Sequence, residues 1–362
     1  MLDYKNPHLI IETSKVSPGK ISWRSPSNIA LIKYWGKYGQ QLPRNPSISF
    51  TLDNAYTETT LEFTPKKGAD RGIALEFFFE DEPNEAFAKK VIQFLDSIGD
   101  IFPFLRQLNL VIRSSNSFPH SAGIASSASS MSALALCLCS LEHALFKTLE
   151  SDENFRKKAS FVARLGSGSA CRSIYATMSM WGESGEIEGS SNLFAIPYEK
   201  ELDEVFKTFH DDILIISTGE KSVSSRAGHA LMEGNIYADN RYTQARQRLH
   251  RLLRSLQTGD LEEFGHITES EALTLHALMM TSNPPYILME PNSLSIINKI
   301  KRFRKESNHP IYFSLDAGPN IHVLYPHSIK GIAQKFITEE LTPFCEDKQC
   351  ISDQVGKGPL QL

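Results

Sequence analysis

The sequence predicts a mixed α+β protein with two domains. Its 362 residues are enough for two separate hydrophobic cores. Segments with alternating apolar and polar residues, typical of strands, occur between segments with apolar residues at helical spacing along the whole chain. Residues 108–145 combine both patterns in the order strand, small-residue loop and helix. We place the boundary in the charged stretch 200–212 and expect domains of residues 1–205 and 206–362.

In the first domain, strands are predicted by alternation or short apolar runs, and helices by apolar residues every three or four positions. Ser25-Pro26-Ser27 separates the first two strands, because proline cannot donate a hydrogen bond to a neighbouring strand. The predicted strands are 21–24, 29–35, 47–52, 57–64, 75–79, 108–112 and 174–181. The predicted helices are 85–97, 131–145 and 152–165, the last one capped by Ser151 or Asp152.

The second domain shows the same two patterns. The predicted strands are 213–216, 311–315, 321–324 and an edge strand at 349–352, and the predicted helices are 237–256, 260–280, 293–304 and 329–341. The helix 237–256 carries many basic residues, which we interpret as a solvated helix face. Tyr242 on this helix and His276 on the next are further pocket candidates, although a His or Tyr at helical spacing more often packs in the fold.

Composition argues against several kinds of partner. The net charge of −4 provides no bulk positive field for nucleic acid or a membrane surface. No apolar stretch approaches the roughly 20 residues that cross a bilayer, and the N-terminus lacks the apolar segment of a signal peptide. The five cysteines lack the spacing of a metal site, so free thiols and a cytoplasmic location are expected.

The stretch FPHSAGIASSASS at 118–130 lies between a predicted strand and a predicted helix. A small-residue loop in this position can direct several backbone N–H groups and hydroxyls at an anion near the helix N-terminus. A serine-rich helix cap has the same composition, so composition alone does not separate the two interpretations. The stretch is not a Walker A loop, because no Gly-Lys-Ser/Thr follows the small residues.

Three charged residues elsewhere are candidates for binding an anionic ligand or acting on it. Lys33 lies in an apolar strand pattern and needs an anionic partner if it is buried, unless the strand ends in solvent there. Arg172 follows the small residues of GSGSACRS and could grip a carboxylate with two parallel donors, although the segment also fits an ordinary turn. Asp316 ends an apolar strand before a Gly-Pro turn, where a carboxylate could orient a hydroxyl toward a phosphate.

These stretches carry a family resemblance. The serine loop resembles the phosphate-binding motif of the GHMP kinase superfamily, P-x-x-x-G-L-x-S-S-A. Together with NIALIKYWGK (28–37), GSGSACRS (166–173) and DAGPN (316–320), the chain resembles the diphosphomevalonate decarboxylase family over most of its length. The resemblance implies a two-domain GHMP kinase fold. Its N-terminal domain would be like ribosomal protein S5 domain 2 and its C-terminal domain ferredoxin-like, with the active site in the cleft between them.

The activity implied by the resemblance is ATP-dependent decarboxylation of (R)-5-diphosphomevalonate to isopentenyl diphosphate in the mevalonate pathway of isoprenoid biosynthesis. ATP would phosphorylate the 3-hydroxyl group, and loss of that phosphate would accompany loss of the C1 carboxylate. Asp316 would act on the 3-hydroxyl with Lys33 beside it, and Arg172 would hold the C1 carboxylate. The implied catalytic residues are Asp316, Arg172, Lys33, Asn28 and Ser127.

The resemblance also implies binding residues, cofactors and a homodimer. Substrate-binding residues would be Tyr34, Trp35, Gly36, Lys37, Ser167, Gly168, Ser169, Ala170, Cys171, Arg172 and Arg226. ATP-binding residues would be Pro119, Ser121, Ala122, Gly123, Ile124, Ala125, Ser126 and Ser127. Mg²⁺ would arrive with ATP, with Ser127 as a candidate ligand, and no separate metal site is assigned.

Departures from the family pattern leave more than one function open. Residues 82–90 lack the arginine that contacts the 5-diphosphate in relatives, whereas Arg226 stands where relatives usually have threonine. Arg226 could supply that charge, and 5-phosphomevalonate could be the substrate instead. A GHMP small-molecule kinase without decarboxylation and a non-catalytic regulator would share the serine loop and the fold. The preferred interpretation requires that the segments near residues 30, 125, 170 and 316 meet in one pocket.

Overall fold

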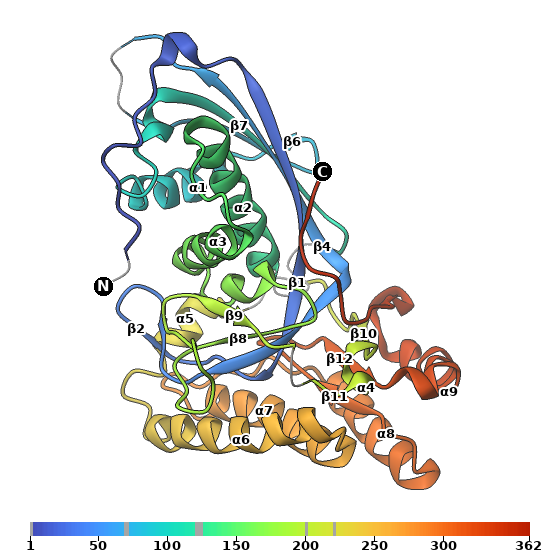
Figure 1. Cartoon of the computed structure of the whole chain (residues 1–362). Coiled ribbons are helices and arrows are strands. Elements are labelled where there is room, and N and C mark those ends of the chain that lie inside the picture. The colour runs from blue at the N-terminus through green and yellow to red at the C-terminus, as the bar shows by residue number, and fades with distance from the viewer. Residues whose placement is uncertain (1–2, 69–71, 120–125, 200–201, 220–221) are drawn as a thin grey trace.

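Strands from all parts of the chain assemble into two main sheets in the computed structural model, which describes residues 3–68, 72–119, 126–199, 202–219 and 222–362 (Figure 1). The larger sheet contains β1 (Gly19–Ile32), β4 (Ser47–Pro65), β5 (Ala74–Phe79), β6 (Glu82–Pro83), β7 (Leu108–Asn116), β8 (Met178–Trp181), β9 (Ala195–Pro197) and β14 (Leu360–Gln361). The smaller sheet contains β10 (His210–Leu214), β11 (Tyr312–Ser314), β12 (Ile321–Tyr325) and β13 (Cys350–Ile351). A short hairpin is formed by β2 (Lys37–Tyr38) and β3 (Leu42–Pro43).

The helices lie against these sheets, so the predicted mixed α+β class is confirmed. They are α1 (Glu85–Ser97), α2 (Ser126–Phe146), α3 (Asp152–Gly166), α4 (Glu204–Lys207), α5 (Ser225–Ala230), α6 (Ala238–Thr258), α7 (Leu261–Met280), α8 (Pro291–Ser307) and α9 (Lys330–Phe336). The predicted bounds of α1 are confirmed, and α3 begins after Ser151, whose side chain accepts a hydrogen bond from the Asn154 N–H. Such a cap satisfies one of the free N–H groups at a helix start.

The two longest strands run through positions where breaks were predicted. Ser25-Pro26-Ser27 does not interrupt β1, which pairs antiparallel with β4 on both sides of Pro26. The register between the two strands shifts between Pro26 and Asn28. Within sheets proline occurs mainly at edges and at irregularities of this kind, because it cannot donate a ladder hydrogen bond. The separate strands predicted at 47–52 and 57–64 are one strand, β4.

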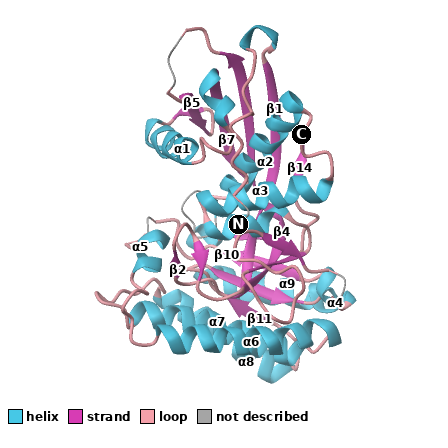
Figure 2. Cartoon of the chain, turned by 60° about the vertical axis from the view of Figure 1, so that its left-hand side comes forward, coloured by secondary structure: helices cyan, strands magenta, loops and turns pink. Residues whose placement is uncertain are grey.

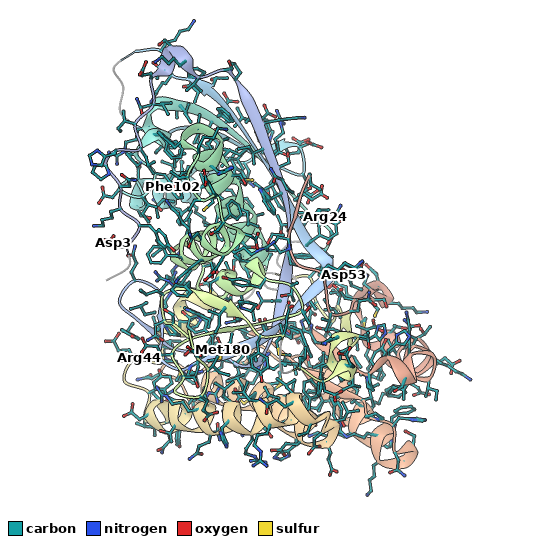
Figure 3. All side chains as sticks on the ribbon, viewed as in Figure 1. Asp3, Arg24, Arg44, Asp53, Phe102 and Met180 are labelled. Atoms are coloured by element: carbon teal, nitrogen blue, oxygen red, sulfur yellow. The ribbon has the colours of Figure 1, made fainter. Side chains whose placement is uncertain are left out.

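Helices α2 and α3 cover one face of the large sheet and enclose the first core (Figure 1). Phe102, labelled in Figure 3, is fully buried in this core together with Leu136 and Trp181. In the other half of the molecule, α7 and α8 pack on β11 of the small sheet, and α6 lies beside α7 (Figure 2). The five cysteines are free thiols, as expected.

Helix α2 is longer than the sequence analysis expected. Among the described residues, one helix, α2, is long and apolar enough to cross a membrane, judged by length and composition only. Inside the fold, 61% of its most apolar window is buried. Its Ala, Leu and Cys side chains pack between the sheet and α3. The core helix of a globular protein has the same composition, and this packing accounts for it.

The C-terminal segment connects the two sheets. After pairing with β10 through β13, it continues to β14, which pairs with β1 at Trp23 and Arg24. Between these strands, the Asp353 carboxylate accepts hydrogen bonds from the backbone N–H groups of Asp53, Asn54 and Ala55 at 2.7–2.8 Å. Asp53 is labelled in Figure 3 at this junction. The edge strand predicted at 349–352 is confirmed as β13, whereas β14 was not predicted.

Candidate active site

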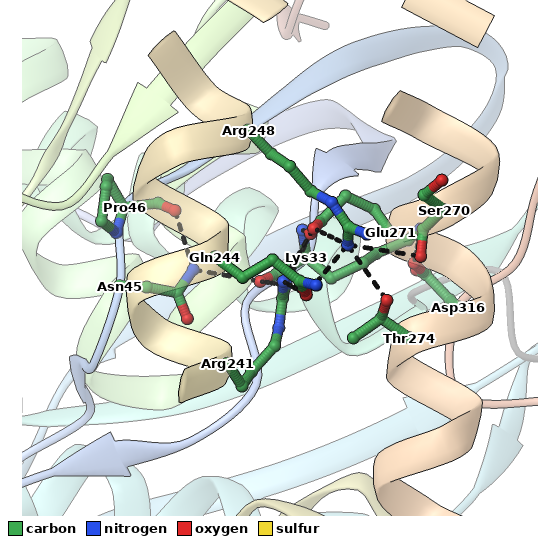
Figure 4. A network of polar contacts seen from close by, with 10 residues as sticks. All are labelled: Lys33, Asn45, Pro46, Arg241, Gln244, Arg248, Ser270, Glu271, Thr274 and Asp316. Atoms are coloured by element: carbon green, nitrogen blue, oxygen red, sulfur yellow. Dashed lines mark hydrogen bonds and ion pairs between the residues drawn. The ribbon is translucent and has the colours of Figure 1, made fainter. Parts of the chain in front are cut away.

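An ion pair joins the two halves of the molecule. Lys33 directly follows β1 of the large sheet, and Asp316 lies just after β11 of the small sheet. The Lys33 Nζ atom lies 2.9 Å from Asp316 Oδ1 (Figure 4). The Lys33 side chain is 2% exposed and the Asp316 side chain 26% exposed, so the carboxylate is the end of the pair that a ligand can reach. The strand predicted for 29–35 ends at Ile32.

Arg172 is buried, with a residue exposure of 2%. It lies in the short 3₁₀ helix η3 (Gly168–Ile174). Its guanidinium donates hydrogen bonds to Ser49 Oγ (3.0 Å), Ser47 Oγ (2.7 Å) and Asn28 Oδ1 (3.2 Å). Within the described part of the chain it forms no salt bridge, and these three partners are neutral. Burial lowers the pKa of Arg172, and Asp316 is near enough for its charge to raise that pKa in opposition.

Asn28 holds Arg172 in a network on β1. The Asn28 Nδ2 group donates to Ser173 Oγ at 2.8 Å and to the Ser169 carbonyl at 3.3 Å, while its Oδ1 accepts from Arg172. Since these three partners all lie in the segment 166–173, the network fixes GSGSACRS against β1. Gly168 is required in this segment, because a Cβ atom there would lie 2.9 Å from both the Tyr34 and the Trp181 rings.

Two predicted substrate-binding residues of this segment belong to the core. Ala170 and Cys171 are fully buried, and the Cys171 thiol donates to the Gly168 carbonyl at 3.0 Å. Burial raises the pKa of Cys171 to about 12, so the thiol is neutral. Any contact between these two residues and a ligand would come from their backbone.

The predicted serine loop is partly helix. Helix α2 begins at Ser126, five positions before the predicted start, so Ser126 and Ser127 lie in its first turn. The Ser127 hydroxyl oxygen lies 3.2 Å from the Ser167 hydroxyl oxygen, which brings the serine loop next to GSGSACRS. Pro119 is half-buried just before the loop. The predicted ATP-binding residues Ser121, Ala122, Gly123, Ile124 and Ala125 lie outside the described residues.

The Tyr34–Lys37 loop is held by a histidine that the sequence analysis did not select. The His229 ring on α5 lies between the rings of Tyr34 and Trp35, with centroid distances of 4.4 and 4.5 Å. Its Nδ1 atom accepts a hydrogen bond from the Gly36 N–H at 3.0 Å. Burial and the nearby Lys37 ammonium lower the pKa of His229 to about 3, so the imidazole is neutral and can accept that bond.

Lys37 and Arg226 form a second cationic centre. Lys37 Nζ donates to Gln41 Oε1 at 2.9 Å. Burial lowers the pKa of Lys37, and the exposed Arg226 on α5 lowers it further. Gly36 next to them has φ +96°, and a Cβ atom there would lie 2.2 Å from the Tyr242 hydroxyl. Two cations near each other at an exposed edge are suited to a polyanionic ligand.

Tyr34, His276 and Arg241 make further contacts at this site. The Tyr34 hydroxyl is buried, with no hydrogen-bond partner among the described residues, and burial raises its pKa. His276 Nε2 lies 3.1 Å from the Asp316 carbonyl oxygen, so His276 contacts the site as well as packing in the fold. The basic face of α6 is not wholly solvated, because Arg241 is buried against Glu271.

The residues present fit a nucleotide phosphate better than a protein-bound metal. In the described part of the chain, no group of three or more His, Cys, Asp or Glu side chains could hold a metal ion. The first turn of α2, a helix of 21 residues, instead offers hydroxyl groups and the positive end of the helix dipole. This donor set suits phosphate oxygens, and a magnesium ion would then be carried by the nucleotide.

Comparisons with known proteins agree with this geometry. Residues 25–193 match the family model described as the diphosphomevalonate decarboxylase-like N-terminal domain. Residues 212–359 match the mevalonate 5-diphosphate decarboxylase C-terminal domain. The chain is 30% identical over 333 residues to a diphosphomevalonate decarboxylase of Ganoderma lucidum, covering 86% of this chain and 80% of that one. It is 28% identical over 356 residues to the enzyme of Schizosaccharomyces pombe, covering 93% and 86%.

Solved structures show the same likeness. The mevalonate diphosphate decarboxylase of Staphylococcus aureus superposes with a TM-score of 0.79 at 29% identity, covering 96% of this chain and 98% of that one. The complex of MDDEF with MVAPP, AMPPCP and magnesium gives a TM-score of 0.78 at 30% identity, covering 96% and 99%. Sequence motifs, fold and site geometry therefore agree, and the chain belongs to the diphosphomevalonate decarboxylase family of the GHMP kinase superfamily.

Proposed function

We propose that this chain catalyses the ATP-dependent decarboxylation of (R)-5-diphosphomevalonate to isopentenyl diphosphate in the mevalonate pathway. One observation carries the proposal: a carboxylate paired with a lysine lies near a buried arginine that forms no salt bridge with any described residue. Relatives over most of the chain are diphosphomevalonate decarboxylases, and one structural neighbour binds MVAPP together with an ATP analogue and magnesium.

Asp316 is proposed to act on the 3-hydroxyl group. Its carboxylate is the partly exposed end of the pair with Lys33, so it can approach a ligand while the ammonium stays behind it. A carboxylate here can orient the hydroxyl toward the γ-phosphate of ATP and accept its proton as the new O–P bond forms. The ion pair with Lys33 holds the Asp316 side chain in place.

Arg172 is proposed to hold the C1 carboxylate. A buried guanidinium with only neutral partners is costly unless an anion approaches it. A planar fork can bind both oxygens of a carboxylate and so fix its plane relative to the bond that breaks. The hydrogen bonds of Arg172 to Ser47, Ser49 and Asn28 orient the guanidinium before the substrate binds.

Phosphorylation makes the decarboxylation possible. A tertiary hydroxyl is a poor leaving group, whereas phosphate is a good one. When the C3–O bond breaks, positive charge develops at C3 and the electrons of the C1–C2 bond form the new double bond as carbon dioxide leaves. The negative charge of the departing phosphate next to C3 stabilises the developing cation. Arg172 meanwhile keeps the carboxylate aligned with the breaking bond.

The polyphosphates are proposed to bind at the two ends of the site. Ser126, Ser127 and the residues before them would hold the ATP phosphates at the start of α2. Magnesium bound to ATP would neutralise part of the negative charge of the phosphates. Lys37 and Arg226 would bind the 5-diphosphate, because the two cations already lie near each other and repel without an anion.

The remaining substrate-binding assignments rest on position. Ser167, Gly168 and Ser169 would line the site through hydroxyls and backbone beside Arg172. Tyr34 brings a buried hydroxyl to the same region, and Trp35 and Gly36 shape the loop that carries Lys37. We further propose a homodimeric cytoplasmic enzyme with domains 1–205 and 206–362, a division supported by family matches that end at 193 and begin again at 212.

The proposal is tested with the purified protein, ATP and one of three substrates: mevalonate, its 5-phosphate or its 5-diphosphate. Release of one carbon dioxide per ADP with the 5-diphosphate is the expected result. Preference for the 5-phosphate would redefine the substrate. ADP formation without carbon dioxide would indicate a small-molecule kinase, and nucleotide binding without turnover would indicate a regulator.

A further inference from the structure

The backbone of Lys33 is held on both sides by residues that face away from the ligand end of the site. The Lys33 N–H donates to Glu271 Oε2 at 2.9 Å. The Lys33 carbonyl accepts from an Arg241 terminal nitrogen at 3.2 Å and from Asn45 Nδ2 at 3.1 Å (Figure 4). Both peptide groups that flank the Lys33 side chain are therefore fixed to α6, α7 and the loop before β4.

The two charged members of this set form a buried pair. Arg241 and Glu271 make two bonds, at 2.7 and 2.5 Å, and their side chains are 1% and 0% exposed. Arg248 adds a further bond to Glu271 at 2.9 Å from the half-buried edge. Burial alone would raise the pKa of Glu271, but Arg241 and Arg248 hold it below its usual value, so the carboxylate is charged.

A buried ion pair contributes little net stability to a fold, because the free-energy cost of removing two charges from water offsets most of their attraction. Apolar side chains of similar volume would serve packing between α6 and α7 at least as well. What apolar side chains cannot provide is an acceptor for the Lys33 N–H together with a donor for its carbonyl. The pair supplies both from the second half of the chain, the half that also carries Asp316.

The hydrogen bonds to the Lys33 backbone determine the position and direction from which its side chain extends. Fixing both peptide groups fixes the direction of the Cα–Cβ bond, and only the side-chain torsions remain free. The short contact of 2.9 Å between Lys33 Nζ and Asp316 Oδ1 thus depends on two connections across the junction. One is the ion pair itself, and the other is the backbone connection through Glu271 and Arg241.

We propose that Glu271 and Arg241 are positioning residues that hold the Lys33 ammonium against Asp316 for the phosphoryl-transfer step. They touch no reacting atom and act through Lys33. This inference rests on the proposed function, since it assigns them a part in the same reaction.

The central variant is Glu271→Gln, which keeps the side-chain shape and one acceptor but removes the charge that orients Arg241. We expect kcat to fall about 10- to 100-fold, as for a small displacement of a catalytic group. The KM values for ATP and 5-diphosphomevalonate should change little, because neither ligand touches Glu271. Glu269→Gln is the matched control. Glu269 lies on the same helix and pairs with Arg304 at 2.6 and 3.0 Å, away from Lys33.

A double-mutant cycle separates positioning from a general structural role. In a Lys33→Ala background the side chain to be positioned is gone, so adding Glu271→Gln should cause no further loss of kcat. The same fold-loss in both backgrounds would overturn the proposal. So would an unchanged kcat in Glu271→Gln alone, provided that the wild-type protein releases carbon dioxide from 5-diphosphomevalonate. Absence of wild-type turnover would instead reject the proposed function.

Arg241→Lys covers the case in which Glu271→Gln does not fold. It retains a cation for Glu271 but loses the second donor arm that reaches the Lys33 carbonyl. A smaller loss of kcat is expected, and this loss should again vanish in the Lys33→Ala background. If thermal melting showed that neither variant folds, the pair would be a structural requirement and the proposal would be wrong.

Discussion

Lys33 and Asp316 are separated by 283 positions in the chain, yet their side chains meet at 2.9 Å. One residue follows a strand of the large sheet and the other follows a strand of the small sheet. Each half of the molecule therefore contributes one member of the pair. The geometry of the reaction centre depends on how the halves are joined, so substitutions around that junction should alter activity in distinct ways.

Replacing Asp316 with asparagine should remove the proton acceptor and leave the shape of the site. We expect kcat to fall about 10²- to 10⁴-fold, the range for loss of a general base. ATP binding, measured by calorimetry, should be nearly unchanged. Asp100→Asn is a suitable control, because the Asp100 side chain is 78% exposed and lies beside Lys5 near the N-terminus. Substantial residual turnover in Asp316→Asn would contradict the assigned role.

Replacing Arg172 with lysine should separate charge from shape. Lysine keeps the cation but cannot contact Ser47, Ser49 and Asn28 while also presenting two parallel donors to a carboxylate. We expect kcat/KM for 5-diphosphomevalonate to fall about 10- to 100-fold, the equivalent of one hydrogen bond to a charged group. Steady-state kinetics check this, and activity equal to that of the wild type would show that the planar fork is not needed.

Replacing Arg226 with alanine should weaken substrate binding and spare the chemical step. Arg226 lies near Lys37 on the side of the site assigned to the 5-diphosphate. Its loss should raise KM for 5-diphosphomevalonate about tenfold, while kcat changes little. Arg254→Ala, at an exposed position on α6, provides the control for removing one surface arginine. An unaltered KM would mean that Arg226 does not bind the substrate.

His229 should make the protein sensitive to mild acid. Its folded pKa of about 3 lies below the usual value of 6.5. Between these two values the unfolded chain binds a proton that the folded chain excludes, so stability is present above pH 6.5 and declines as the pH falls. From pH 6.5 to 5 this single group should reduce the free energy of unfolding by about 2 kcal/mol.

The variant His229→Gln tests this pH dependence. Glutamine offers an acceptor for the Gly36 N–H without titrating. Its free energy of unfolding in urea should therefore decline less than that of the wild type over the same pH interval. Parallel curves for the two proteins would show that His229 does not titrate as assigned.

Gly168→Ala should disturb the site through a steric clash. The added Cβ atom would lie 2.9 Å from the Tyr34 and Trp181 rings, which are closely packed there. Overpacking of this kind typically costs about 1–3 kcal/mol, and the segment that carries Arg172 would shift with it. A lower melting temperature and a lower kcat are expected together. Gly185→Ala is the control, since nothing lies within 4 Å of a Cβ atom at that position.

Local sequence patterns predicted most elements of this fold. The bounds of α1 were predicted correctly from apolar residues at helical spacing, and the structure adds an Asn84 cap that accepts a hydrogen bond from the Phe87 N–H. Patterns failed where tertiary contacts decide the outcome. Proline at position 26 was expected to end a strand, but the long neighbouring strand β4 pairs with β1 on both sides of it. The serines at 126–130 were assigned to a loop, yet they form the first turns of α2. The strongly apolar residues that follow them are buried in the core and stabilise the whole helix.

The residues proposed to react could be selected from the sequence, whereas the residues that support them could not. Lys33, Arg172 and Asp316 stand out because each is a charge in an apolar or glycine-rich context, and the family motif names them. Glu271 and Arg241 lie on helices where charged residues normally face water, so no local signal marks them as buried. His229 likewise becomes informative only when two distant aromatic rings are seen on either side of it.

The route of the C-terminal segment has a consequence for synthesis of the chain. Leu360 and Gln361 complete the edge of the large sheet beside Arg24 and Trp23, which are translated more than 300 residues earlier. Asp353 likewise covers backbone groups at 53–55 that are translated some 300 residues earlier. During translation the edge of β1 at Trp23 and Arg24 therefore stays unpaired until residues 360 and 361 have been added.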